Sequence, residues 1–76
     1  MEIKEFIQHF SAQFDDEPTG IEADSIFREI EDWSSLVALS IIAMVDEEYG
    51  VKLTGDDIRS SVTINDVFEK VKSKKN

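Results

Sequence analysis

The segment from Ser35 to Tyr49 constrains the fold more than any other part of the chain. It carries apolar residues at helical spacing and contains neither Gly nor Pro, so it predicts a helix over 35–49. Ser34 or Ser35 can cap its start, because a serine oxygen accepts from the free backbone N–H groups there. Gly50 lies where a C-terminal glycine belongs. Apolar residues occur all around this helix, which we therefore expect to be central: Leu36, Val37, Ala38, Leu39, Ile41, Ile42, Ala43, Met44 and Val45.

Three further helices are expected around this central one. The first should end near 15–20, where Pro18 and Gly20 interrupt helical geometry. A brief third helix is expected over 54–60, and a last one after Thr63, which with Asp66 resembles a capping box. Residues 71–76 are expected to form a frayed tail. The apolar stripes of the first and last helices are Ile3, Phe6, Ile7, Phe10 and Phe14, and Ile64, Val67, Phe68 and Val71.

The segment 21–34 has no clear apolar period. We interpret it as an extended loop with one helical turn, held to the core by Ile26, Phe27, Ile30 and Trp33. The chain is long enough for one domain. We therefore predict that residues 1–76 form a single all-α domain, a four-helix bundle with a long first loop and a short third helix.

Charge and composition exclude several classes of function. The chain has 17 acidic and 8 basic residues and a net charge of −9, which argues against nucleic acid and against anionic membrane surfaces. This negative charge either favours association with a basic protein partner or serves solubility alone. The absence of cysteine excludes disulfides, thiolate metal sites and a cysteine nucleophile. The single histidine, His9, lies on the flank of the apolar stripe of the first helix, and we expect it to be an ordinary surface or boundary residue. We predict no metal site and no catalytic site.

No segment approaches the roughly 20 apolar residues that span a bilayer. The longest apolar run is Ile41–Val45, and the N-terminal sequence has no basic region followed by an apolar core. We therefore expect a cytoplasmic protein with no membrane partner.

Two short segments, one at each end of the predicted central helix, resemble the sequence pattern of a known protein family. Trp33-Ser34-Ser35-Leu36 opens the predicted central helix, and 46–53, Asp-Glu-Glu-Tyr-Gly-Val-Lys-Leu, closes it. This pattern resembles the acyl carrier proteins, whose signature is Asp-Ser-Leu at the start of the second helix, followed one helix later by an acidic run, an aromatic residue and a glycine. The distance from Ser35 to Gly50 is that of the family. The long first loop, the short third helix and the acidity also agree.

The resemblance implies a function. The family's serine, here Ser35, receives 4′-phosphopantetheine from coenzyme A through a phosphopantetheinyl transferase. The thiol of that arm then holds an acyl group as a thioester for ketosynthase-type and other acyl-processing enzymes. The carrier itself is not an enzyme, and we expect a monomer.

The chain departs from the family pattern in two places. Ser34 replaces the usual Asp and adds a second hydroxyl, but Leu36 and the distance to Gly50 favour Ser35 as the attachment site. The first two turns of the central helix also lack the family's acidic residues, so we expect an apolar docking patch near the arm, with acidic residues further along. The predicted docking residues are Trp33, Leu36, Val37, Ser40, Asp46, Glu47, Asp56 and Asp57.

Other interpretations remain open. The chain could carry amino acids as an aminoacyl or peptidyl carrier protein, or act as an unmodified acidic helical adaptor. Trp33 either packs the long loop or shapes the docking surface. A set of apolar residues would line an acyl cavity or simply form the core: Phe6, Ile7, Phe10, Leu39, Ile42, Ala43, Ile58, Ile64, Val67 and Phe68.

Overall fold

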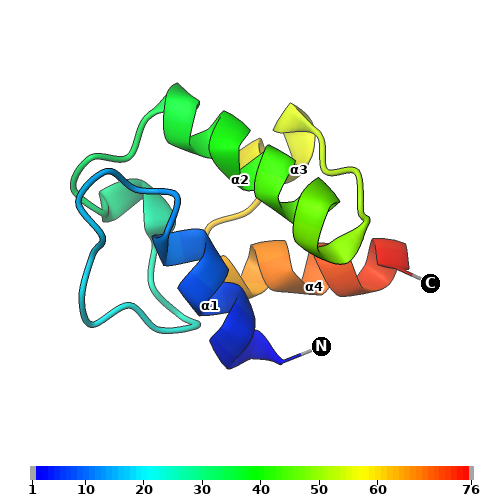
Figure 1. Ribbon diagram of the computed structural model, residues 1–76, viewed down its shortest axis with the longest axis horizontal. Helices are drawn as coiled ribbons and strands as arrows, with labels where there is room; N and C mark the ends of the chain where they lie inside the picture. The colour runs from blue at the N-terminus through cyan, green and yellow to red at the C-terminus, as the bar shows by residue number, and fades with distance from the viewer. Residues whose placement is uncertain (1, 76) are drawn as a thin grey trace.

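The computed structural model describes residues 2–75, within which the chain forms four α-helices, one 3-10 turn and no strand. The elements are α1 (Ile3–Ser11), η1 (Phe27–Glu29), α2 (Ser35–Tyr49), α3 (Gly55–Arg59) and α4 (Ile64–Lys75). Figure 1 shows α2 across the top of the molecule, with α1 and α4 below it. The predicted all-α class and helix order are confirmed, with a long connection after α1 and a short α3.

The ends of α2 are set by local chemistry. The Ser34 hydroxyl accepts from the Val37 backbone N–H at 3.3 Å. At the other end, Gly50 adopts a left-handed conformation with φ of 67°, and its N–H donates to the carbonyl of Asp46. A side chain at this position would strain the backbone, so glycine fits here. Both predicted helix ends are confirmed.

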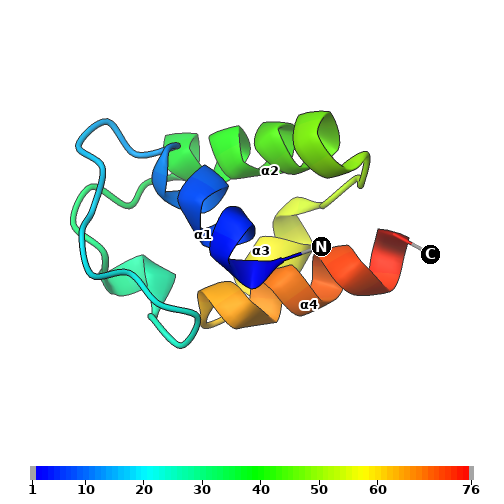
Figure 2. The same cartoon turned by 60° about the horizontal axis from the view of Figure 1, so that its bottom comes forward.

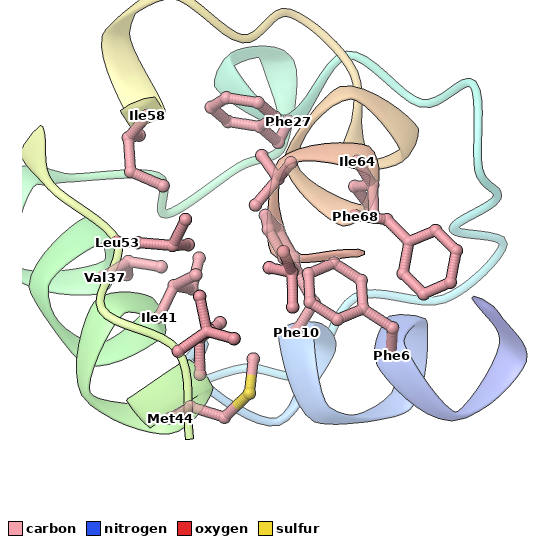
Figure 3. Packing of buried hydrophobic residues seen from close by; sticks show 14 of the residues in the cluster. Phe6, Phe10, Phe27, Val37, Ile41, Met44, Leu53, Ile58, Ile64 and Phe68 are labelled. Atoms are coloured by element: carbon pink, nitrogen blue, oxygen red, sulfur yellow. The ribbon is translucent and has the colours of Figure 1, made fainter. Parts of the chain in front are cut away.

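The core is formed where α1, α2 and α4 meet around a group of aromatic rings. The Phe6 ring centroid lies 5.3 Å from that of Phe68 on α4, and Phe10 lies 5.9 Å from Phe27 in η1. Figure 3 shows Ile41 of α2 projecting toward these rings from the opposite side. The rings therefore join α1, the long connection and α4 into one apolar cluster.

The connection between α1 and α2 is fixed to the start of α4. Ile26 forms an isolated antiparallel bridge with Thr63. The N–H of Asn65 donates to the carbonyl of Ala23 at 2.8 Å, and that of Ile64 to the carbonyl of Ser25 at 3.2 Å. Figure 2 shows this connection running along the side of the molecule and reaching the first turn of α4. The predicted loop is thus long but well anchored.

Two predicted helix ends were wrong. α1 ends at Ser11, and Phe14 reaches the core from the turn that follows, where its N–H donates to the Ser11 carbonyl. The frayed tail predicted over 71–76 is instead helical as far as Lys75, while Asn76 lies outside the described residues. α4 continues because Val71 is fully buried and the Lys75 ammonium donates to the Tyr49 carbonyl at 2.8 Å.

Asp57 gives the fold a dependence on pH. The Asp57 carboxylate lies 2.7 Å from the Lys74 ammonium and forms a capping box with Thr54. The hydrogen bond from Lys74, followed by those from Thr54, lowers the pKa of Asp57 below its ordinary value. A depressed pKa in the folded state gives stability that is present above the unfolded pKa and lost as the pH falls through the folded pKa.

The free energy of unfolding should therefore decrease as the pH falls below about 4. Asp57→Asn should lower stability at pH 7 and weaken this acid dependence. Urea unfolding of both proteins between pH 7 and pH 2 measures the effect. Asp16→Asn, the same change in the exposed connection, is the control. Equal acid dependence in wild type and Asp57→Asn would contradict the prediction.

Candidate functional site

The two serines at the start of α2 have different roles. Ser34 is the N-cap, and its oxygen is engaged by the Val37 N–H. Ser35 is the first helical residue and is exposed, and its hydroxyl makes no hydrogen bond within residues 2–75. Both serines are exposed, but only the Ser34 hydroxyl is engaged in capping the helix, which leaves that of Ser35 free of a structural role.

A pocket of about 360 Å³ opens beside Ser35, between α2 and α3. Its walls are largely apolar, but they include Ser35 and two arginines, and among residues 2–75 no Asp or Glu lines them. The pocket is lined by Arg28, Trp33, Ser35, Ala38, Leu39, Ile42, Gly55, Ile58 and Arg59. The surroundings of Ser35 thus combine apolar surface with positive charge, although the molecule is strongly acidic.

Arg28 fixes one side of this pocket. Its guanidinium donates to the carbonyl oxygens of Ser61 at 2.6 Å, Ile58 at 2.8 Å and Arg59 at 3.0 Å. The same group lies 4.8 Å from the ring centroid of Phe27. Because Ile58 and Arg59 are the last residues of α3 and Ser61 follows it, Arg28 ties η1 to the C-terminal end of that helix.

Neither Arg28 nor Arg59 was predicted from the sequence to be a site residue. The sequence does contain one indication for Arg28, because it is the sole basic residue between Gln13 and Trp33. An isolated cation in an acidic segment is a candidate for a specific contact. Its partners lie about thirty positions further along the chain, so the sequence could not identify them.

Arg28→Gln is expected to lower the free energy of unfolding by about 1–3 kcal/mol, because hydrogen bonds from a charged donor are lost. Amide hydrogen exchange in α3 should accelerate as well. Arg28→Lys should restore only part of the stability, since an ammonium lacks the planar fork. Urea unfolding and amide exchange measure both effects. Arg59→Gln, which removes an exposed guanidinium, is the matched control, and equal losses in Arg28→Gln and Arg59→Gln would contradict the assignment.

The outer face of α2 is apolar and exposed. Leu36 is 74% exposed and Leu39 62%, whereas Val37 is only 8% exposed and Ile41 is fully buried. Val37 therefore belongs to the core, and its prediction as a docking residue was wrong. The predicted cavity position of Ala43 was also wrong, since Ala43 is exposed. The cause is that α2 is apolar on nearly every side, so helical period alone could not select its inner face.

Leu39 and Ser40 lie between the buried face and the fully exposed face of this helix. Leu39 was predicted to line an acyl cavity or to form the core, but its side chain is largely exposed and lies at the rim of the pocket. Ser40 is half-buried. With Leu36, these residues give the first turns of α2 a surface that is apolar or uncharged, as the sequence predicts.

Most of the predicted acidic docking residues already have partners. Asp46 pairs with Lys52 at 2.9 Å, Asp56 pairs with Arg59, and Asp57 is held by Lys74 and Thr54. Glu47 is exposed and makes no ion pair within the described part of the chain. It is thus the predicted acidic residue most available to a partner.

The interpretation of Trp33 as a packing residue is confirmed. Its ring centroid lies 4.8 Å from that of Phe27 and 6.2 Å from that of Phe14. The indole remains half-buried and also lines the pocket. Trp33 thus holds the end of the long connection while it forms part of the site.

His9 lies apart from this site. Its Nε2 atom is 3.6 Å from a carboxylate oxygen of Glu5 and 3.9 Å from one of Glu48, and the side chain is 31% exposed. This is the boundary position predicted from the sequence.

Across residues 2–75, no group of three or more His, Cys, Asp or Glu side chains could hold a metal ion. No helix in the same range has the length and apolar character to cross a membrane.

The candidate site is therefore the first half of α2, with an exposed hydroxyl, a pocket beside it and two leucines open to solvent. Its residues come from η1, α2 and α3 and from Trp33. The arrangement offers a nucleophilic oxygen to an external enzyme and an apolar surface to a partner. Comparisons of the chain with protein-family models, with curated proteins and with solved structures found no match.

Proposed function

We propose that this chain is an acyl carrier protein that bears 4′-phosphopantetheine on Ser35 and catalyses no reaction itself. The observation that carries the proposal is the position of Ser35, which is exposed in the first turn of α2 while Ser34 provides the helix cap. The resemblance at 33–36 and 46–53 supplies the identity of the group. An order of helices with a long first connection and a short α3 supports the same assignment.

The residues around Ser35 fit such an arm. A phosphodiester at this position would lie near the N-terminus of α2, where free backbone N–H groups and the helix dipole favour an anion. No Asp or Glu of the described range 2–75 lines the pocket, and Arg28 and Arg59 contribute positive charge. The walls formed by Ile42 and Ile58 suit an apolar cargo.

The attachment uses one oxygen of this chain. The Ser35 hydroxyl attacks the pantetheine-bearing phosphorus of coenzyme A, so that an Oγ–P bond forms as the P–O bond to adenosine 3′,5′-bisphosphate breaks. The hydroxyl proton passes to a base of the phosphopantetheinyl transferase. The thiol of the arm supplies the thioester that carries the acyl group.

The exposed face of α2 supports docking to acyl-processing enzymes such as ketosynthases. Leu36 and Leu39 offer apolar contact close to Ser35, and Glu47 lies further along the same helix. Such a partner would present an apolar patch near the arm and a basic group about three helical turns further along α2. The carrier would act as a monomer that visits several enzymes in turn.

Incubation with coenzyme A, magnesium and a broad-specificity phosphopantetheinyl transferase, followed by intact mass measurement, tests the proposal. We expect one phosphopantetheine addition per chain. Absence of any addition, also with the transferase of the source organism, would contradict the proposal and favour an unmodified adaptor that uses the exposed leucines alone. Loading of the arm with an amino acid by an adenylating enzyme, and not with an acyl group, would favour a peptidyl carrier.

A further inference from the structure

We propose that Arg59 changes its ionic partner when Ser35 is modified, leaving Asp56 and pairing with the phosphodiester of the arm. The inference rests on the proposed function and assigns a positioning residue to the same site. Arg59 and Ser35 line one pocket between α2 and α3. The guanidinium therefore faces the space into which a group attached to Ser35 would extend.

The present partner of Arg59 is easily exchanged. Arg59 and Asp56 are three residues apart on α3, and their side chains are 73% and 86% exposed. Ion pairs so exposed contribute little to stability, because water screens them and both side chains lose freedom. A phosphodiester keeps its negative charge at every pH where proteins fold, and its two free oxygens match the planar guanidinium fork.

Gly55 leaves room for Arg59 at the wall of the pocket. A Cβ atom at Gly55 would lie 3.3 Å from the nearer terminal nitrogen of Arg59, so the guanidinium lies directly over this glycine. Both residues line the pocket. The guanidinium therefore lies at the pocket wall, at its solvent-exposed side.

Arg28 cannot take this role, although it lines the same pocket. Its guanidinium is held by the carbonyl oxygens of Ile58, Arg59 and Ser61 at 2.6–3.0 Å. Movement toward Ser35 would break these hydrogen bonds. Arg28 instead fixes the C-terminal end of α3, from which Arg59 projects, and adds a constant positive field.

The exchange would change the surface that partners meet. When Arg59 turns to the phosphodiester, the carboxylate of Asp56 loses its cation. Asp56 was predicted as a docking residue, and in the unmodified chain it is paired. The arm-bearing form would therefore present a free carboxylate beside the site that the unmodified form lacks.

Phosphorus-31 NMR of the arm-bearing protein tests the inference, with intact mass confirming the modification. Arg59→Gln should move the phosphodiester resonance away from its wild-type position. Added salt should move the wild-type resonance toward that of Arg59→Gln, because salt screens an exposed ion pair. Asp56→Asn, which frees Arg59, should not move the resonance toward that of Arg59→Gln.

Lys52→Gln is the matched control, since it removes one cation of an exposed ion pair at the far end of α2. Its resonance should coincide with the wild-type one. Equal positions for wild type and Arg59→Gln, or equal shifts in Arg59→Gln and Lys52→Gln, would overturn the inference while the arm itself is present. A chain that accepts no arm by mass would overturn the inference and the proposed function together.

Discussion

Ser35→Ala is expected to abolish addition of the phosphopantetheine arm, whereas Ser34→Ala should still be modified. Alanine at 35 lacks the oxygen that would form the bond to phosphorus. Ser34 has a hydroxyl, but that oxygen accepts from the Val37 N–H at the start of α2. Intact mass after treatment with coenzyme A and the transferase measures the outcome for each variant.

The effect on stability should be larger for Ser34→Ala than for Ser35→Ala, which is the opposite of the effect on modification. Loss of the N-cap in Ser34→Ala should cost about 0.5–2 kcal/mol of unfolding free energy. Ser35 is exposed and has no cap role, so Ser35→Ala should stay within about 0.5 kcal/mol of wild type. Urea unfolding of both variants therefore shows whether lost modification reflects a lost nucleophile or a disturbed helix.

Each alternative outcome has a clear meaning. Addition lost in Ser34→Ala alone would keep the carrier function and move the attachment site to Ser34. Addition retained in both single variants would show that either hydroxyl can react. That result would contradict the assignment of Ser35 as the single site.

Phe10→Ala is expected to remove most of the stability of the domain. Phe10 is fully buried, and its ring packs 6.0 Å from Phe6, 6.2 Å from Phe14 and 5.9 Å from Phe27. Truncation of a buried phenylalanine costs about 3–5 kcal/mol, since contacts are lost and a cavity remains. Natural domains have only about 5–15 kcal/mol in total, and small domains lie at the lower end.

Circular dichroism and urea unfolding would measure this loss. Leu39→Ala, which truncates a largely exposed side chain on α2, is the matched control and should change stability by about 0.5 kcal/mol or less. Phe10→Leu should fall between the two, because it keeps much of the buried volume. A Phe10→Ala protein within about 1 kcal/mol of wild type would contradict the role given to this ring in the core.

The features that could be predicted from the sequence are those with local causes. Both ends of α2 follow from neighbouring residues, with Ser34 as cap and Gly50 in a left-handed conformation. The capping hydrogen bonds at Thr63 and Asp66 are likewise local. The attachment residue followed from a short motif and its distance to Gly50, and that assignment stays a prediction until modification is measured.

The features that escaped prediction depend on partners far along the chain. α4 extends to Lys75 because lysines near its end donate to the carbonyls of Tyr49 and Lys52. The pocket beside Ser35 includes Arg28, which is positioned by carbonyls at the C-terminal end of α3. Only the folded chain brings these groups together. The inner face of α2 was ambiguous for a different reason, since its apolar residues give almost no periodic contrast.

The exposed leucines of α2 also have a consequence for solubility. Leu36 and Leu39 leave apolar surface open to water, and such surface drives copies of a protein together. The net charge of −9 opposes that attraction through mutual repulsion. Acid that protonates about half of the carboxylates brings the net charge close to zero and leaves the leucines unchanged. We therefore expect self-association to be strongest at the acidic pH where the net charge is close to zero, and to weaken again at lower pH, where the basic residues give the chain a net positive charge.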